Sequence, residues 1–282
     1  MTSRLFSRPA RRLWGLTLTA LLSAGATFAG ATFSWAETLK IGVVPGAYAD
    51  TVNVAASEAR AKGLDVEVIE FSDWTTPNVA LNAGDIRLNF FQHAPFLKNA
   101  NTQGGYDLVV VAPGILANLG LYSLKHKSFD EIPQGGTVAI ANDPVNQGRG
   151  LLLLQKAGLI TLKDDVGFLG TVDDIIANPR NLTFTEVEGP QLARITGDVD
   201  LAQGYPHFIV AAGTFDPASA LIYSGIEDRQ FAVSFVARAD HKDDADIKQF
   251  IEIFQTSPAV EEQARKSFAD SDKLYILAWK VQ

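Results

Sequence analysis

The chain has 282 residues, a formal net charge of −8 at pH 7 and no cysteine. The negative charge argues against nucleic acid or an anionic membrane surface as a partner. The lack of cysteine excludes disulfides, thiolate metal sites and a cysteine for lipid attachment.

The first 36 residues have the pattern of a signal peptide. Four arginines precede an apolar stretch at 13–33, and the segment ends in Ser34-Trp35-Ala36, with small residues where a signal peptidase reads. A membrane anchor is the alternative, but the stretch is rich in Gly, Ala and Thr and close to the minimum length of a spanning helix. We expect cleavage after residue 36, leaving a more acidic, soluble protein in the periplasm.

Strands and helices alternate along the first part of the remaining chain. The patterns predict strands at 39–44, 64–71, 86–91 and 106–112. They predict a helix at 51–62 after an N-cap at Asp50, a second from Thr76 to the glycine at 84, and a third at 94–100. This alternation indicates α/β structure with right-handed crossovers and a mostly parallel sheet.

The alternation resumes after residue 114. Strands are predicted at 119–124, 137–141, 182–187, 199–202 and 231–237. Helices are predicted at 144–157, 172–177, 190–196, 244–255 and 258–268. We interpret the chain as two α/β units: lobe one is 37–113 plus 232–282, and lobe two is 114–231. Ligands of such sheets bind beyond the carboxyl ends of the strands, so a cleft between the lobes is the expected site.

No sequence pattern indicates a catalytic centre. The four histidines, at 93, 126, 207 and 241, are scattered without metal-ligand spacing, and the sequence has no nucleophile elbow, P-loop or dinucleotide fingerprint. We therefore expect a binding protein rather than an enzyme, without metal or cofactor.

The segment Asn142 to Gly150 indicates an anion site. Asp143 is a plausible N-cap and Pro144 the first helical residue, which places Arg149 about one and a half turns into a helix. Gly148 and Gly150 each cost about 1 kcal/mol relative to alanine in a helix interior. One interpretation is that a ligand carboxylate approaches the backbone and pairs with the arginine. The other is that Arg149 forms a surface or interlobe salt bridge while the glycines permit tight helix packing.

Two further segments carry aromatic candidates. "LNFFQHAPFL" (88–97) places Phe91 and His93 at the end of a strand, where ligands sit in an α/β unit. "DWTTPN" (73–78) places Trp74 in a strand-to-helix loop, where it can wall an apolar ligand. A core or helix-entry histidine and a tryptophan that covers the core are the structural alternatives.

With these segments the sequence resembles the NlpA family of substrate-binding proteins, the methionine-binding components of ABC importers. The resemblance covers nearly the whole mature chain. It rests on "KIGVVPG" (40–46), on 71–97 with its F-Q-H-x-P stretch, on 140–164 with N-D-P-x-N-x-G-R, on 178–192 and on "FVARADHKDD" (235–244).

The resemblance implies a two-lobed periplasmic-binding-protein fold of the type II kind that closes on a small ligand and docks onto an inner-membrane permease and its ATPase. It implies that Arg149 pairs with the ligand carboxylate and that Trp74, Phe91 and His93 form the side-chain pocket. Asn146 of the same motif is a further candidate. The implied protein is a monomer that captures methionine or a related amino acid or carboxylate.

The sequence departs from the family at the ammonium end of the site. Where methionine-binding members hold the ammonium with two asparagines, this chain has Tyr205 and Val233. A buried ammonium without partners is costly. Either Glu188 or a backbone carbonyl replaces the asparagines, or the ligand is an organic acid without an α-amine. Two alternatives from other classes stay open: a sensory or scaffolding protein without transport, and a hydrolase, which would need a nucleophile in the cleft.

Overall fold

The computed structural model describes residues 37–227 and 229–281. The predicted signal peptide at 1–36 lies outside the described residues. Within them, no helix combines the length and apolar character needed to cross a membrane.

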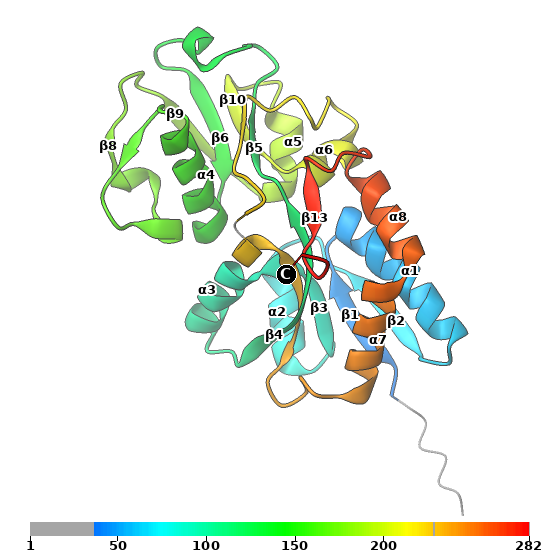
Figure 1. Ribbon diagram of the computed structural model, residues 1–282. Coiled ribbons are helices and arrows are strands. Elements are labelled where there is room, and N and C mark those ends of the chain that lie inside the picture. Colours follow the sequence, from blue (N-terminus) through cyan, green and yellow to red (C-terminus); the bar gives the residue numbers. More distant parts are fainter. Residues whose placement is uncertain (1–36, 228, 282) are drawn as a thin grey trace, which may run out of the picture. The chain divides into compact units, whose positions relative to one another are not determined.

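A six-stranded sheet forms the first half of the fold. Its strand order is β13-β4-β12-β3-β1-β2. The strands are β1 (Leu39–Val43), β2 (Val66–Glu70), β3 (Leu88–His93), β4 (Leu108–Ala117), β12 (Val233–Arg238) and β13 (Tyr275–Leu277). Its helices are α1 (Ala47–Ala61), α2 (Thr76–Ala83), α3 (Ala94–Gly104), α7 (Ala245–Thr256) and α8 (Pro258–Ser267). Figure 1 shows α7 and α8 returning from the far end of the chain to lie beside α1.

A five-stranded sheet of order β11-β5-β10-β6-β9 forms the second half. Its strands are β5 (Gly120–Tyr122), β6 (Thr137–Ala141), β9 (Thr183–Val187), β10 (Leu201–Gly204) and β11 (Ile222–Tyr223). Its helices are α4 (Pro144–Lys156), α5 (Leu192–Ile195) and α6 (Pro206–Ala212). A separate ribbon pairs β7 (Thr161–Leu162) with β8 (Ile175–Ala177).

The expectation of a mostly parallel sheet was wrong. Strand β1 pairs in parallel with β2 and β3, but β12 inserts between β3 and β4 and is antiparallel to both. In the second sheet β6 is parallel to β9 and β10, whereas β5 is antiparallel to β10 and β11. The antiparallel pairs arise because β12 and β5 reach their places by chain returns that lack the crossover helix of a parallel connection.

Several element boundaries also differ from the prediction. Helix α1 starts at Ala47, before the expected cap Asp50, because Gly46 takes the N-cap position with φ of 111°. The expected helix at 172–177 is one 3-10 turn followed by β8. Strand β4 continues beyond its expected end to Ala117, and helix α6 with strands β7, β11 and β13 were not anticipated.

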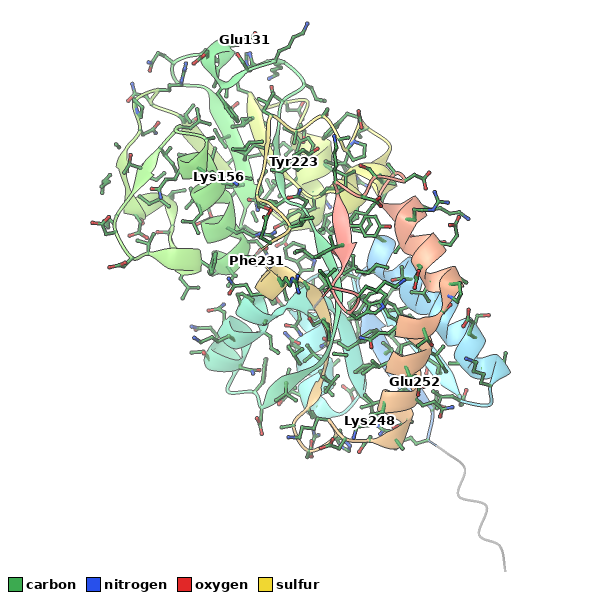
Figure 2. All side chains as sticks on the ribbon, in the orientation of Figure 1. Glu131, Lys156, Tyr223, Phe231, Lys248 and Glu252 are labelled. Carbon is green, nitrogen blue, oxygen red and sulfur yellow. The ribbon has the colours of Figure 1, made fainter. Side chains whose placement is uncertain are left out.

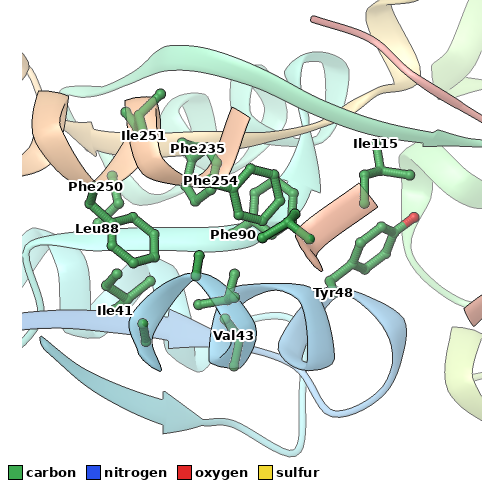
Figure 3. Packing of buried hydrophobic residues seen from close by; sticks show 14 of the residues in the cluster. Ile41, Val43, Tyr48, Leu88, Phe90, Ile115, Phe235, Phe250, Ile251 and Phe254 are labelled. Atoms are coloured by element: carbon green, nitrogen blue, oxygen red, sulfur yellow. The ribbon is translucent and has the colours of Figure 1, made fainter. Parts of the chain in front are cut away.

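Aromatic side chains fill the core of the first half. The ring of Phe90 stacks on Phe235 with centroids 4.3 Å apart, and Phe254 packs edge-on against both. Figure 3 shows this cluster between β1 and β3 on one side and α7 on the other, with Tyr48 at its edge. This core fixes the end of β3, from which Phe91 and His93 emerge.

Helix α4 begins as the sequence predicts but uses its glycines differently. The Asp143 carboxylate accepts a hydrogen bond from the Asn146 backbone N–H at 3.0 Å, and Pro144 is the first helical residue. A Cβ on Gly148 would lie 2.4 Å from the Phe168 carbonyl oxygen, and one on Gly150 would lie 2.4 Å from Gln203 Oε1. The protein's own chain, not a ligand, therefore occupies the space beside both glycines.

We expect Gly148→Ala to lower the free energy of unfolding by about 1–3 kcal/mol, because its methyl group overlaps a backbone carbonyl. Urea denaturation of both variants measures this. Gly197→Ala is the matched control, since its Cβ would meet nothing nearer than Leu124 at 3.9 Å. Equal stabilities of the two variants would contradict the packing argument.

Candidate functional site

One pocket collects nearly all the predicted ligand-binding residues from the two halves of the fold. Its lining includes seven of them: Arg149, Trp74, Phe91, His93, Asn146, Tyr205 and Val233. Glu188, the eighth, does not line the pocket, and its carboxylate accepts a hydrogen bond from Asn142 Nδ2 at 2.9 Å.

Arg149 supplies the charge of the pocket. Its side chain is 6 % exposed, and its guanidinium carbon lies 4.1 Å above the centre of the Phe231 ring. Figure 2 shows Phe231 between the two halves of the fold. Among the described lining residues, Arg149 is the only Arg, Lys, Asp or Glu. The pocket therefore has a positive field that favours an anion.

His93 joins the two halves across the pocket. Its Nδ1 accepts from the Phe96 backbone N–H at 3.2 Å, which places the ring proton on Nε2. Nε2 then donates to Asn146 Oδ1 at 3.1 Å, and Asn146 Nδ2 donates to both Asp143 carboxylate oxygens at 3.1 Å. Burial, reinforced by the charge of Arg149, lowers the pKa of His93 to about 3. The histidine is thus a neutral link between β3 and the start of α4.

Aromatic rings form much of the rest of the pocket lining. Trp74 comes from the loop before α2 and stacks on Phe208 of α6 with centroids 6.3 Å apart. The same indole lies edge-on to Tyr205, also at 6.3 Å. It covers the backbone of Gly189, where a Cβ would lie 1.9 Å from the indole ring. Trp74 therefore closes the pocket against the second half of the fold.

Sequence reasoning missed five aromatic lining residues: Tyr48, Phe96, His207, Phe208 and Phe231. His207 and Phe208 lie on α6, the helix that was not predicted. A signal was present, since Pro206 occupies the first helical position and Gly213 ends the helix in the left-handed conformation. Tyr48 escaped notice because α1 was expected to start after it.

The geometry defines a ligand-binding protein in which a pocket lies between two α/β halves. In the described part of the chain no group of three or more His, Cys, Asp or Glu side chains is arranged to hold a metal ion. The fold is the two-lobed periplasmic-binding-protein fold of the type II kind, as solved relatives show.

Comparison with known proteins identifies the family. Residues 39–276 match the NlpA lipoprotein family. The chain is 43 % identical to the D-methionine-binding lipoprotein MetQ of Escherichia coli O157:H7 over 232 residues, covering 82 % of this chain and 85 % of that protein. The chain belongs to the NlpA lipoprotein family.

Solved structures agree. A periplasmic substrate-binding protein of an ABC transporter from Coxiella burnetii superposes with a TM-score of 0.76 at 36 % identity, covering 85 % of this chain and 99 % of that one. A nutrient-binding protein from Burkholderia cenocepacia, solved bound to methionine, gives 0.77 at 36 % identity, with coverages of 82 % and 97 %. Both relatives are binding proteins, and the first is a component of an ABC transporter.

The buried histidines predict an acid-sensitive fold. Burial lowers the pKa of both His93 and His207 to about 3, against about 6.5 in an unfolded chain. Between these values the unfolded chain binds more protons than the folded one, so the free energy of unfolding falls as pH falls through this window. The expected loss is up to about 1.4 kcal/mol per pH unit for each histidine.

Urea unfolding at about pH 7, 6 and 5 measures this dependence. In His93→Gln the free energy of unfolding should fall less steeply as the pH is lowered, because only His207 then contributes its part of the slope. A slope equal to that of the unmodified protein would show that His93 does not stay neutral in the folded state.

Proposed function

We propose that this chain is the substrate-binding component of an ABC importer and that its pocket captures a small carboxylate, either methionine or a related amino acid or organic acid. The observation that carries the proposal is the buried guanidinium of Arg149 at a pocket whose other described lining side chains are uncharged and mostly aromatic or apolar. A planar guanidinium binds a carboxylate with two parallel hydrogen bonds. The methionine-bound relative supports this ligand class.

We further propose that the ligand is bound and released without chemical change. Lobe one would comprise 37–113 plus 232–282 and lobe two 114–231; the presence of two sheets supports two lobes, while β4 extends the first sheet to Ala117. Binding would close the lobes, with the His93–Asn146 hydrogen bond and the Trp74 contacts forming on closure. Release then requires these contacts between the lobes to break.

The cellular setting follows from the same proposal. We propose export by the segment 1–36 and a freely soluble monomer in the periplasm, because the sequence has no cysteine to carry the lipid of the lipoproteins it resembles. An inner-membrane permease and its ATPase are the proposed partners, as the ABC-transporter relative suggests. Mass spectrometry of natively purified protein would identify the bound compound.

Arg149→Met should abolish capture of the identified compound while keeping most of the packing on Phe231. Removing one partner of a buried charge pair costs at least about 2 kcal/mol, which corresponds to a loss of affinity of about 30-fold or more. Calorimetry measures the loss, and Arg149→Ala should behave in the same way.

Arg194→Ala is the matched control, because Arg194 is an exposed arginine of α5 outside the pocket lining. It should bind as the unmodified protein does. Wild-type affinity in Arg149→Met, with circular dichroism unchanged, would show that the guanidinium does not hold the ligand.

Ligand binding should change the emission of Trp74, since its indole lines the pocket. Only one other tryptophan, Trp279, lies in the predicted mature chain, and its indole N–H donates to the Gln255 carbonyl oxygen away from the pocket. Trp74→Phe should therefore lose the fluorescence response and Trp279→Phe should retain it. The opposite pattern would place the ligand elsewhere.

A further inference from the structure

His207 is a buried polar side chain whose hydrogen-bonding capacity is unused. It is 3 % exposed, it lines the pocket, and its Nδ1 is buried without a hydrogen-bond partner in the described residues. Burial lowers the pKa of His207 to about 3, so near pH 7 the ring is neutral and offers one N–H donor and one nitrogen acceptor. Buried polar groups are nearly always paired, so an unpaired one at a pocket points to a ligand or an ordered water.

Tyr48 lies beside His207 and faces the same space. The two ring centroids are 4.7 Å apart, and Tyr48 also lines the pocket. Figure 3 shows its hydroxyl pointing away from Phe90 and the aromatic core of the first half. Burial raises the pKa of Tyr48, and the charge of Arg149 opposes that rise. The phenol therefore stays protonated and lies within electrostatic reach of the guanidinium.

The amide and phenol groups in the rest of the lining already make hydrogen bonds within the protein. Gln92 Oε1 accepts from Asn78 Nδ2 at 2.8 Å, and Asn146 Oδ1 accepts from His93 Nε2. The Tyr205 hydroxyl accepts from Gln203 Nε2 at 3.2 Å, which leaves its own proton to donate. The described lining contains no carboxylate. An ammonium, which donates three hydrogen bonds, would therefore meet no negative charge here and only neutral oxygens that already accept one hydrogen bond, besides the Tyr48 hydroxyl and a His207 nitrogen.

We propose that Tyr48 and His207 form a second polar subsite that binds an uncharged oxygen on the carbon next to the ligand carboxylate. The substrate class is then a small 2-hydroxy or 2-oxo carboxylic acid with an apolar side chain, rather than an α-amino acid. We assign this subsite to the carboxylate end of the ligand, because Tyr48 lines the same pocket as Arg149 and the guanidinium charge acts on the phenol. The inference rests on the proposed function and adds to it the identity of the group beside the carboxylate.

The test compares acids that share a side chain and differ only at that carbon. The first series is 4-(methylthio)butanoate, its 2-hydroxy and 2-oxo derivatives, and methionine; the second carries an isobutyl side chain with the same four substituents. Calorimetry on the full mature protein should show the 2-hydroxy or the 2-oxo acid binding about 3- to 10-fold more tightly than the unsubstituted acid, the gain expected of added neutral hydrogen bonds. The amino acid should be the weakest of each series.

Tyr48→Phe and His207→Phe keep the aromatic rings and remove the polar atoms. In each, the affinity ratio of the 2-oxygen acid to the unsubstituted acid should fall toward unity, because the hydrogen bonds to the added oxygen are lost. Tyr223→Phe is the matched control, because the Tyr223 hydroxyl donates to the Pro217 carbonyl oxygen outside the pocket. It should keep the preference.

Two results overturn the inference: an amino acid binding more tightly than both of its 2-oxygen counterparts, or a preference that survives in both Tyr48→Phe and His207→Phe. A failure of the proposed function would give a different result in the same binding measurements. In that case no acid of either series binds, or all bind equally well to Arg149→Met, and the second subsite falls together with the carboxylate site.

Discussion

The burial of one positive charge between two sheets is the constraint on which the site depends. Removing an ion from water costs several kcal/mol even after relaxation of its surroundings. The described contacts of the guanidinium include the Phe231 ring, whose centre lies 4.1 Å from the guanidinium carbon, and the Ala117 carbonyl and Ser224 hydroxyl oxygens, each 3.5 Å from Nη2. His93 and His207 remain neutral and Tyr48 remains protonated, because burial shifts each pKa away from the charged form. Arg149 is therefore the charged side chain among the described lining residues, which favours a negatively charged ligand.

The position of that charge is set by contacts that also join the two halves. Asp143 caps α4 and holds Asn146, whose amide oxygen receives the His93 proton from the other sheet. Gly148 and Gly150 let α4 pack against Phe168 and Gln203, which fixes the helix that carries Arg149. The same turn of α4 therefore carries both the cation and the hydrogen bond between the two halves.

The features that could be predicted from the sequence are those that depend on residues close together in the chain. The cap at Asp143, the proline after it and the left-handed Gly84 that ends α2 depend on neighbouring residues, and all three were predicted. Contacts between residues that are far apart in the sequence could not be predicted in this way. The space beside Gly148 belongs to Phe168, and the amide oxygen beside Gly150 comes from Gln203 in another strand. Glu188, the predicted alternative partner of an ammonium, follows β9 and accepts a hydrogen bond from Asn142 instead of lining the pocket.

The family fold and the substrate are determined by different parts of the chain. Relatives that share about two fifths of their residues share the sheets, since the core tolerates volume-conserving changes. Substrate choice depends on the few polar atoms that a ligand meets in a water-poor pocket, where one unpaired group outweighs many apolar contacts. With Val233 apolar, Tyr205 engaged by Gln203 and His207 unpaired, the hydrogen-bonding pattern beside Arg149 suits an uncharged oxygen. A protein can therefore keep the fold of a methionine-binding family while a handful of lining residues changes the group that it recognises.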